Sequence, residues 1–279
     1  MRAQLGLILA ATLLAGCAST VQTTSGAGYL AARPEFQPPA GNSVERAVYD
    51  AAKAEPALRF PARLGLARIQ GGRLSAIPPE EGDKWLALAK DLGTTYGEFV
   101  PISPLVADMA SSGRANDTVV DKIRIGAARQ HVDAVLVYEV VRSDKDRGSV
   151  LSVADLTIIG SFLIPSRSIE GQATATAILL DVRNGYPYGT ATSTAQQTGF
   201  VPNSGSGAAA RDLAEQASVD AVGKLTTDIK QMVARLKSEL DTRELQRLRA
   251  TPAASPSRRA QPAPRTGLSS GTATPGRQP

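Results

Sequence analysis

The spacing of apolar residues predicts a chain in which strands and helices alternate. Residues 62–70 alternate, so that Leu64 and Leu66 share one face of a predicted strand, which the Gly71-Gly72 pair ends. Residues 78–93 then show the three-to-four spacing of a helix that turns one stripe toward a core, formed by Trp85, Leu88, Ala89 and Leu92. Such alternation favours α/β or α+β units on a mixed sheet.

Other segments of the first half extend this pattern. A helix is predicted from Asn42 or Ser43 to about residue 55, a short strand at 98–102 and a helical turn at 104–109. A further helix is expected over 118–130, with Asp117 as its cap. In the helix that begins at the Pro78-Pro79 pair, the acids at 80 and 81 are placed to favour the positive end of the helix dipole.

The middle of the chain predicts a β-meander. Residues 133–141 are apolar on both faces, as in a central strand, and a polar turn is expected at 143–148. An apolar run at 150–164 and a strictly alternating strand at 169–182 follow. Asn184-Gly185 then predicts a hairpin turn with a return strand over residues 188–197.

The last predicted element is a long helix over residues 208–249. Its apolar stripe is expected to pack on the chain's own sheet, although the same stripe also suits the seam of an oligomer. The stripe comprises Leu213, Ala217, Ala221, Leu225, Ile229, Met232, Leu236 and Leu240. The fold class is therefore α+β or α/β, with a mixed sheet, a meander, packed helices and a long C-terminal helix. Residues 42–249 form the predicted single domain, and the proline- and arginine-rich residues 250–279 are expected to be disordered.

The amino terminus carries the layout of a secretory signal peptide over residues 1–16. Arg2 precedes an apolar run at 5–14, which is shorter than the ~20 residues that a membrane-spanning helix needs. The run closes on Leu14-Ala15-Gly16-Cys17, which resembles the lipobox of bacterial lipoproteins. That resemblance implies diacylglycerol on the Cys17 thiol, cleavage before Cys17, and acylation, typically with palmitate, of the new terminus.

Two consequences follow for the position of the domain. The lipoprotein resemblance also implies the outer membrane, because the residue after Cys17 is Ala18 rather than the Asp that resembles an inner-membrane retention signal. Residues 17–41 are poor in apolar side chains, so they are expected to form a flexible tether. About 23 such residues would hold the domain ~25 Å from the membrane.

Composition argues against nucleic acid as a partner. The net charge is +5, but Arg2 lies in the signal peptide and the tail supplies Arg258, Arg259, Arg265 and Arg277, so that the remaining chain is close to neutral. A nucleic-acid-binding domain is expected to carry a basic face on the folded part. Cys17 is the only cysteine, so a disulfide within the mature chain is excluded.

Motifs for catalysis, cofactors or metals are not found. His131 is the only histidine and is expected to lie at a helix end; without a second histidine or a free cysteine it does not predict a zinc site or a Ser-His-Asp triad. Residues 144–148 resemble the start of a calcium loop but lack its further ligands. Gly205-Ser206-Gly207 resembles a dinucleotide fingerprint without the acidic partner that this motif requires. We therefore expect no catalytic, metal or cofactor site.

Several strand segments together resemble the rhombotarget family of bacterial lipoproteins. The resemblance rests on residues 156–165, 177–182, 132–138 and 64–67, and it spans about residues 59–240. The order of elements also resembles the fold of the TolB amino-terminal domain and of the curli secretion lipoprotein. These resemblances imply helices on a mixed sheet and a role in envelope assemblies.

The functional expectation is a non-enzymatic envelope lipoprotein that acts as an adaptor or assembly factor facing the periplasm. Its partners would be the membrane, through Cys17, and envelope proteins, and a homo-oligomer is left open. One alternative is a subunit of an export channel of the curli-secretion type. It is disfavoured because residues 189–207, needed as a second membrane hairpin, are polar on both faces. The other alternative is a cell-wall hydrolase with paired carboxylates.

Overall fold

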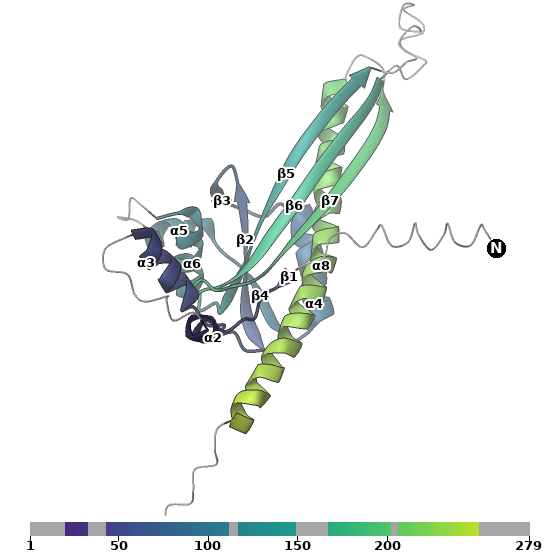
Figure 1. The fold of residues 1–279 in the computed structure, drawn as a ribbon. Helices are drawn as coiled ribbons and strands as arrows, with labels where there is room; N and C mark the ends of the chain where they lie inside the picture. The colour runs from purple at the N-terminus through teal and green to yellow at the C-terminus, as the bar shows by residue number, and fades with distance from the viewer. Residues whose placement is uncertain (1–19, 33–42, 112–116, 149–166, 202–205, 251–279) are drawn as a thin grey trace, which may run out of the picture. The chain divides into compact units, whose positions relative to one another are not determined.

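A computed structural model describes residues 20–32, 43–111, 117–148, 167–201 and 206–250 (Figure 1). Residues Met1–Thr242 belong to one compact unit, and Arg243–Pro279 to a second, of which the helical residues up to Ala250 are described. Cys17, the apolar run at 150–164 and the tail after Ala250 lie outside the described residues. The predictions made for these segments therefore stay predictions.

The first unit is built on one mixed sheet. Its path is β1-β7-β6-β5-β2-β3, and β4 also pairs with β2. β2 runs parallel to β4 and β5, whereas the other pairs are antiparallel, which confirms the predicted mixed sheet. The strands are β1 Thr20–Val21, β2 Ala62–Gln70, β3 Arg73–Ser75, β4 Gly97–Pro101, β5 Ala134–Gly148, β6 Arg167–Asp181 and β7 Pro187–Val201.

Helices cover both faces of this sheet. On one face lie α4 and α8, and on the other α5 and α6 (Figure 1). The described helices are α2 Gly26–Ala31, α3 Ser43–Ala52, α4 Pro79–Leu92, α5 Pro104–Ser111, α6 Val119–Arg129 and α8 Ser206–Ala250. The α/β class and the long C-terminal helix are thus confirmed.

Each face of the sheet packs on its own apolar cluster. Leu64 and Leu66 of β2 join the cluster under α4 and α8, and Ala67 joins the cluster under α6. β5 also contributes to both clusters, with Leu136 on one side and Val137 on the other. This confirms the expected faces of β2 and the central position of β5.

The stripe of α8 packs on the sheet of its own chain, as expected. Its residues from Ala217 to Leu236 are buried in the cluster that α8 shares with β6 and β7. Small residues bring the two layers close together: a Cβ built on Gly171 of β6 would lie 2.3 Å from the backbone nitrogen of Ala214. Within Met1–Thr242 this stripe is therefore a core contact.

The polar turn predicted at 143–148 is wrong. β5 continues to Gly148, which pairs with Arg167, and every residue from Ala134 onward has a partner on β6. Charged residues do not end a strand whose backbone groups stay paired, and the segment contains no proline. The residues that resemble a calcium loop therefore lie on a strand.

Other elements depart from the predicted boundaries. Thr118, rather than Asp117, caps α6: its hydroxyl accepts a hydrogen bond from the Asp121 amide, and the Asp121 carboxylate accepts one from the Thr118 amide. β3 was not predicted, because a three-residue strand carries too little alternation to recognise. Of the tether expected over 17–41, the described residues 20–32 contain β1 and α2, and β1 pairs with β7, so these residues are folded onto the unit.

Candidate docking groove

An open groove of about 550 Å³ lies between α4, β4 and the segment that enters α5. Its walls are mostly apolar and include Ile77, Trp85, Leu86, Phe99, Ile102 and Pro104. Prolines at 78, 79, 101 and 104 border it, and their restricted backbones stiffen the walls. The groove can therefore accept an apolar segment without large rearrangement of its backbone.

Further exposed apolar side chains lie on α5, whose first residue, Pro104, lines the groove. Leu86, which lines the groove, is 54% exposed. Leu105 follows the groove residue Pro104 and is 69% exposed, and Met109, one helical turn later, is 64% exposed. Single exposed apolar residues are ordinary, but a group that adjoins an apolar groove is typical of a protein-binding surface.

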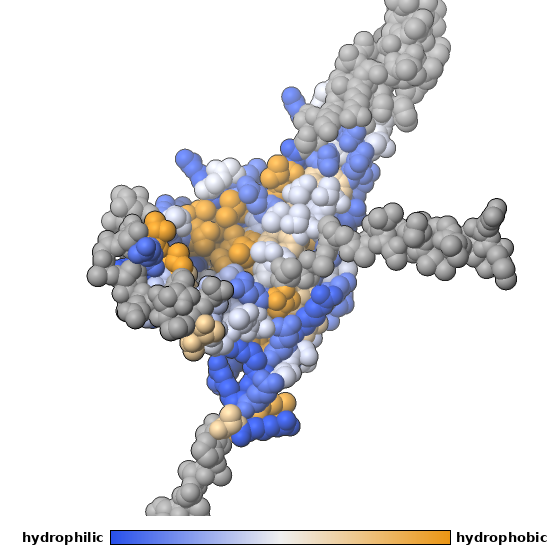
Figure 2. Space-filling model, viewed as in Figure 1, coloured by the Kyte–Doolittle hydropathy of each residue, from blue (hydrophilic) through white to orange (hydrophobic). Residues whose placement is uncertain are grey.

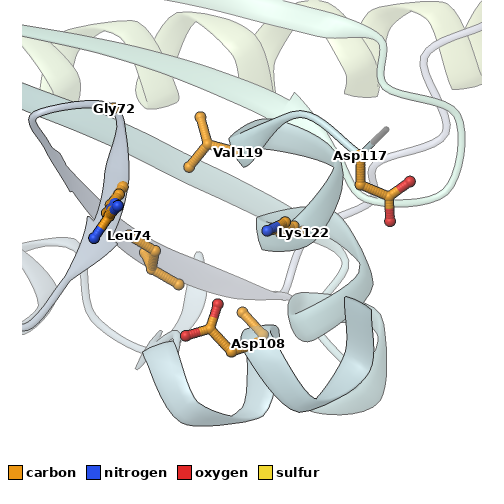
Figure 3. Close-up of a pocket in the computed structure, with 8 residues that line it drawn as sticks. Gly72, Leu74, Asp108, Asp117, Val119 and Lys122 are labelled. Carbon is orange, nitrogen blue, oxygen red and sulfur yellow. The ribbon is translucent and has the colours of Figure 1, made fainter. Parts of the chain in front are cut away.

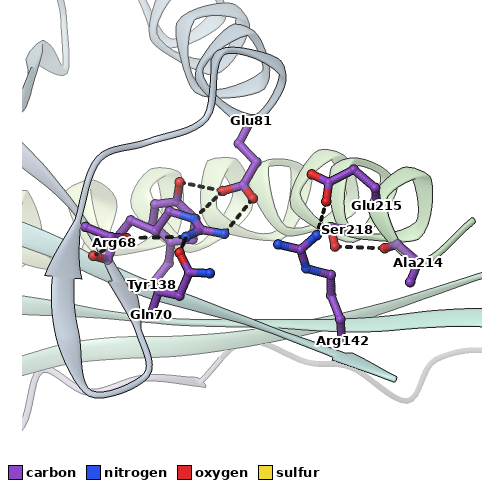
Figure 4. A network of polar contacts seen from close by, with 9 residues as sticks. Arg68, Gln70, Glu81, Tyr138, Arg142, Ala214, Glu215 and Ser218 are labelled. Carbon is purple, nitrogen blue, oxygen red and sulfur yellow. Dashed lines mark hydrogen bonds and ion pairs between the residues drawn. The ribbon is translucent and has the colours of Figure 1, made fainter. Parts of the chain in front are cut away.

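A buried polar cluster fastens α4 beside this groove. Arg68 of β2 and Glu81 of α4 are 2% and 1% exposed. The guanidinium donates from Nε and Nη2 to the two oxygens of Glu81, over 2.8 and 3.0 Å, and the Tyr138 hydroxyl donates to Glu81 Oε2 over 2.9 Å (Figure 4). The other guanidinium nitrogen donates to Gln70 and Ser75. The charges are thus paired and hydrogen-bonded, as burial requires.

This cluster and the groove share residues. Ser75 and Trp85 line the groove, Ser75 accepts from Arg68, and the Trp85 ring lies 5.0 Å from the ring of Tyr138. Burial, and next the charge of Glu81, raise the pKa of Tyr138 far above its ordinary value, so that the phenol stays a neutral donor. The cluster therefore sets the position of α4 and, with it, one wall of the groove.

Sequence reasoning missed this cluster. It assigned Glu81 to the helix dipole, whereas the carboxylate faces the sheet. One signal was present in β2: Arg68 falls on the same face as Leu64 and Leu66, where a core-facing strand normally carries an apolar residue. A charge in that row indicates a buried partner.

Further along the sheet, Arg142 of β5 forms an ion pair with Glu215 of α8 (Figure 4). Both side chains are partly exposed, so the pair adds little to stability. It does connect α8 to β5.

A second hollow, of about 500 Å³, lies where β3, α5 and α6 meet (Figure 3). Leu74 and Val119 provide apolar walls, while Asp108, Asp117 and Lys122 add charges of both signs. Figure 2 shows apolar side chains gathered over β2 and β3 beside α6, where the partly buried Ile69, Leu74, Val119 and Val120 lie. Within the described ranges no group of three potential metal ligands is found. The hollow therefore combines apolar walls with charges of both signs.

The remaining residues singled out from sequence do not come together. His131 is exposed and has a positive φ of 55°, and its amide donates to the Ala128 carbonyl at the end of α6, as expected of a helix-terminal residue. Residues 144 and 146 lie on β5, and Cys17 is outside the described residues. No helix in the described part of the chain is long and apolar enough to cross a bilayer.

Comparisons with known proteins place the chain beside bacterial lipoproteins of solved structure. A PelC dodecamer from Paraburkholderia phytofirmans is 17% identical, with a TM-score of 0.26, over 62% of this chain and 91% of that one. Lipoprotein GNA1162 from Neisseria meningitidis is 16% identical, with a TM-score of 0.29, over 56% and 97%. A minor lipoprotein from Acinetobacter baumannii is 11% identical, with a TM-score of 0.32, over 63% and 93%.

At these identities and TM-scores the likeness carries no argument about function. No family model matches the chain, and no curated protein matches its sequence. The resemblances to the rhombotarget family, the TolB domain and the curli secretion lipoprotein therefore stay predictions.

Proposed function

We propose that this protein is a lipid-anchored lipoprotein of the bacterial envelope, held at the outer membrane by Cys17 and facing the periplasm. In this proposal it is a non-enzymatic adaptor or assembly factor, and it binds an envelope protein through the groove beside α4. The observation that carries the proposal is the apolar groove continued by Leu86, Leu105 and Met109. An adaptor needs such a surface, and it needs no catalytic group.

The anchor is tested by metabolic labelling with radioactive palmitate. The wild-type chain should incorporate label, and Cys17→Ser should not. Retention of label in the Cys17→Ser variant would contradict the anchor.

The docking role is tested by cross-linking in intact membranes. The wild-type chain should give a discrete cross-linked band with an envelope protein, and Leu86→Glu should lose it because a carboxylate in an apolar groove must be desolvated. Lys90→Glu is the matched control, since Lys90 is exposed on the same helix and its substitution changes the charge by more. Recovery of monomer alone, or equal loss in both variants, would count against the groove as the docking site.

A further inference from the structure

The segment just after the predicted lipid anchor is tied firmly to the sheet. Thr20 and Val21 of β1 pair with Thr190 and Gly189 of β7, and the Gln22 amide donates to the Tyr188 carbonyl over 2.8 Å. The Val21 side chain packs against the core cluster under α8. Backbone pairing and apolar contact therefore hold the same residues.

Buried side chains add further ties. The Tyr186 hydroxyl donates to the carbonyls of Gln22 and Thr24, over 2.7 and 3.2 Å, from a ring that is buried. The Thr23 hydroxyl donates to Glu239 of α8 over 2.5 Å, and the Ser25 hydroxyl donates to Glu55 over 3.0 Å. These bonds lie within Met1–Thr242 and fasten the chain from Thr20 onward to the domain.

The length of chain left for a tether is therefore very short. Cys17 precedes Thr20 by three residues, and an extended chain spans at most ~3.3–3.6 Å per residue. The lipid-bearing residue thus lies within about 10 Å of Thr20, rather than ~25 Å from the domain as a fully flexible tether would allow. Such a short connection brings the sheet edge that carries β1 against the bilayer.

The side chains at this edge suit a layer of lipid headgroups. Gln22, Thr192 and Thr194 are exposed, uncharged and polar, and the two threonine hydroxyls also bond to threonine hydroxyls of β6. Lys224 of α8 is exposed beside them, and its ammonium donates to the Thr194 carbonyl over 3.0 Å. Hydroxyl, amide and ammonium groups can donate hydrogen bonds to phosphate oxygens.

Acidic side chains of α8 near this edge already accept hydrogen bonds from neighbouring side chains. Asp228 accepts from the Ser193 hydroxyl over 2.6 Å, and Asp220 accepts from the Gln197 amide. Each of these carboxylates therefore has a hydrogen-bond donor of its own and keeps its negative charge, so that the neutral polar groups and Lys224 are the ones that can donate to phosphates.

We propose that β1, the adjoining edge of β7 and the neighbouring side of α8 form a membrane-apposed surface, whose partner is the headgroup layer of the bilayer that holds the anchor. This inference rests on the lipid anchor proposed above. The docking groove lies beside β4, five strand positions away from β1 along the sheet. At ~4.8 Å per strand the groove is about 24 Å along the sheet from the anchored edge, so a bilayer at that edge leaves the groove open to a partner.

The test uses the lipidated full-length protein in phospholipid vesicles. Because lipidation consumes Cys17, the only cysteine, an introduced cysteine is the single reactive thiol. A short-range fluorophore is attached at Gln22→Cys beside β1, at Gln231→Cys on α8, or at Arg73→Cys on β3 at the opposite edge. Spin-labelled headgroups then quench the dyes that lie near the bilayer surface.

The expected result is strong loss of fluorescence at positions 22 and 231, and little loss at position 73. Inserting about 15 Gly/Ser residues after Ala18, enough for a mean reach of ~20 Å, should lower quenching at 22 and 231 to the level of 73. Mass spectrometry of the N-terminal peptide reports the lipid in the same samples.

Lipidated protein with equal quenching at the three positions, or quenching unchanged by the insertion, would overturn this inference and leave the anchor intact. An N-terminal peptide without lipid would overturn both. A dimer in detergent that persists in vesicles and shields positions 22 and 231 would assign the β7 edge to a second copy instead, which also overturns the membrane assignment.

Discussion

The most incisive perturbation of this fold is Glu81→Gln. The substitution keeps the size of the side chain and one carbonyl oxygen, but it leaves the guanidinium of Arg68 buried without a counter-charge. Removing one partner of a buried ion pair costs about 3–5 kcal/mol. Because the introduced amide can still accept one hydrogen bond through its carbonyl oxygen, we expect a loss of about 3 kcal/mol, at the lower end of that range.

Equilibrium unfolding in urea measures this loss directly. Trp85 is the only tryptophan, is buried, and lies 5.0 Å from the Tyr138 ring, so its fluorescence reports the packing around the cluster. With an m-value of ~2 kcal/mol/M, a loss of about 3 kcal/mol lowers the midpoint by about 1.5 M. The m-value itself should stay unchanged, because the surface exposed on unfolding is the same.

Glu98→Gln is the matched control. It makes the same chemical change in the partly exposed ion pair between Arg63 and Glu98, where we expect less than ~1 kcal/mol. The double variant Arg68→Met with Glu81→Leu should recover much of the stability lost by Glu81→Gln, since it removes both buried charges. A midpoint for Glu81→Gln equal to that of the control would refute the reasoning.

Three further outcomes follow from single contacts. Burial raises the pKa of both Tyr138 and Tyr188 above their ordinary 10.0, so the stability that these phenols contribute is complete below pH 10 and is lost as the pH rises above it. The urea midpoint should therefore fall between pH 9 and pH 11, and Tyr138→Phe should make this fall smaller. An unchanged slope in the variant would exclude the Tyr138 phenol as its cause. Gly171→Val should destabilise by about 3 kcal/mol or more, because its Cβ meets the α8 backbone, and a calorimetric Tm like that of wild type would contradict the close approach. Thr118→Ala should cost about 1 kcal/mol at pH 7. The Thr118 hydroxyl also lowers the pKa of Asp121, so the contribution of Asp121 to folding stability is present above pH 3.8 and is lost as the pH falls below it. Acid titration by NMR should show a higher Asp121 pKa in Thr118→Ala than in the wild type. An unchanged pKa would disprove the cap.

The elements that sequence predicted well are those with long periodic patterns. The strand at 62–70 matches β2 residue for residue, and the predicted helix after Pro78 matches α4. Both carry apolar residues whose spacing reports a buried face, and their ends are marked by Gly71-Gly72 and Gly93. The stripe of α8 was recognisable for the same reason.

The parts that sequence did not predict depend on contacts between distant residues. Arg68, Glu81 and Tyr138 lie on three elements, and nothing in their local sequence encodes which of them meet. The scarcity of apolar residues over 17–41 predicts a tether. The described residues 20–24 are held instead by backbone pairing with β7 and by the Tyr186 hydroxyl, interactions that composition does not report.

The short tether changes what an adaptor of this form can do. A flexible linker of about 23 residues would let the groove sample every height above the membrane within reach of the linker. It would thereby lower the effective concentration of the groove at any one height. If Cys17 carries the proposed anchor, β1 is fixed to β7 only three residues after it, and the height of the groove is instead set by the width of the sheet. A partner is then met at one height, about 24 Å beyond the anchored edge. On this reasoning the sheet itself is the spacer between the lipid and the bound protein, and the strand order decides where the partner is held.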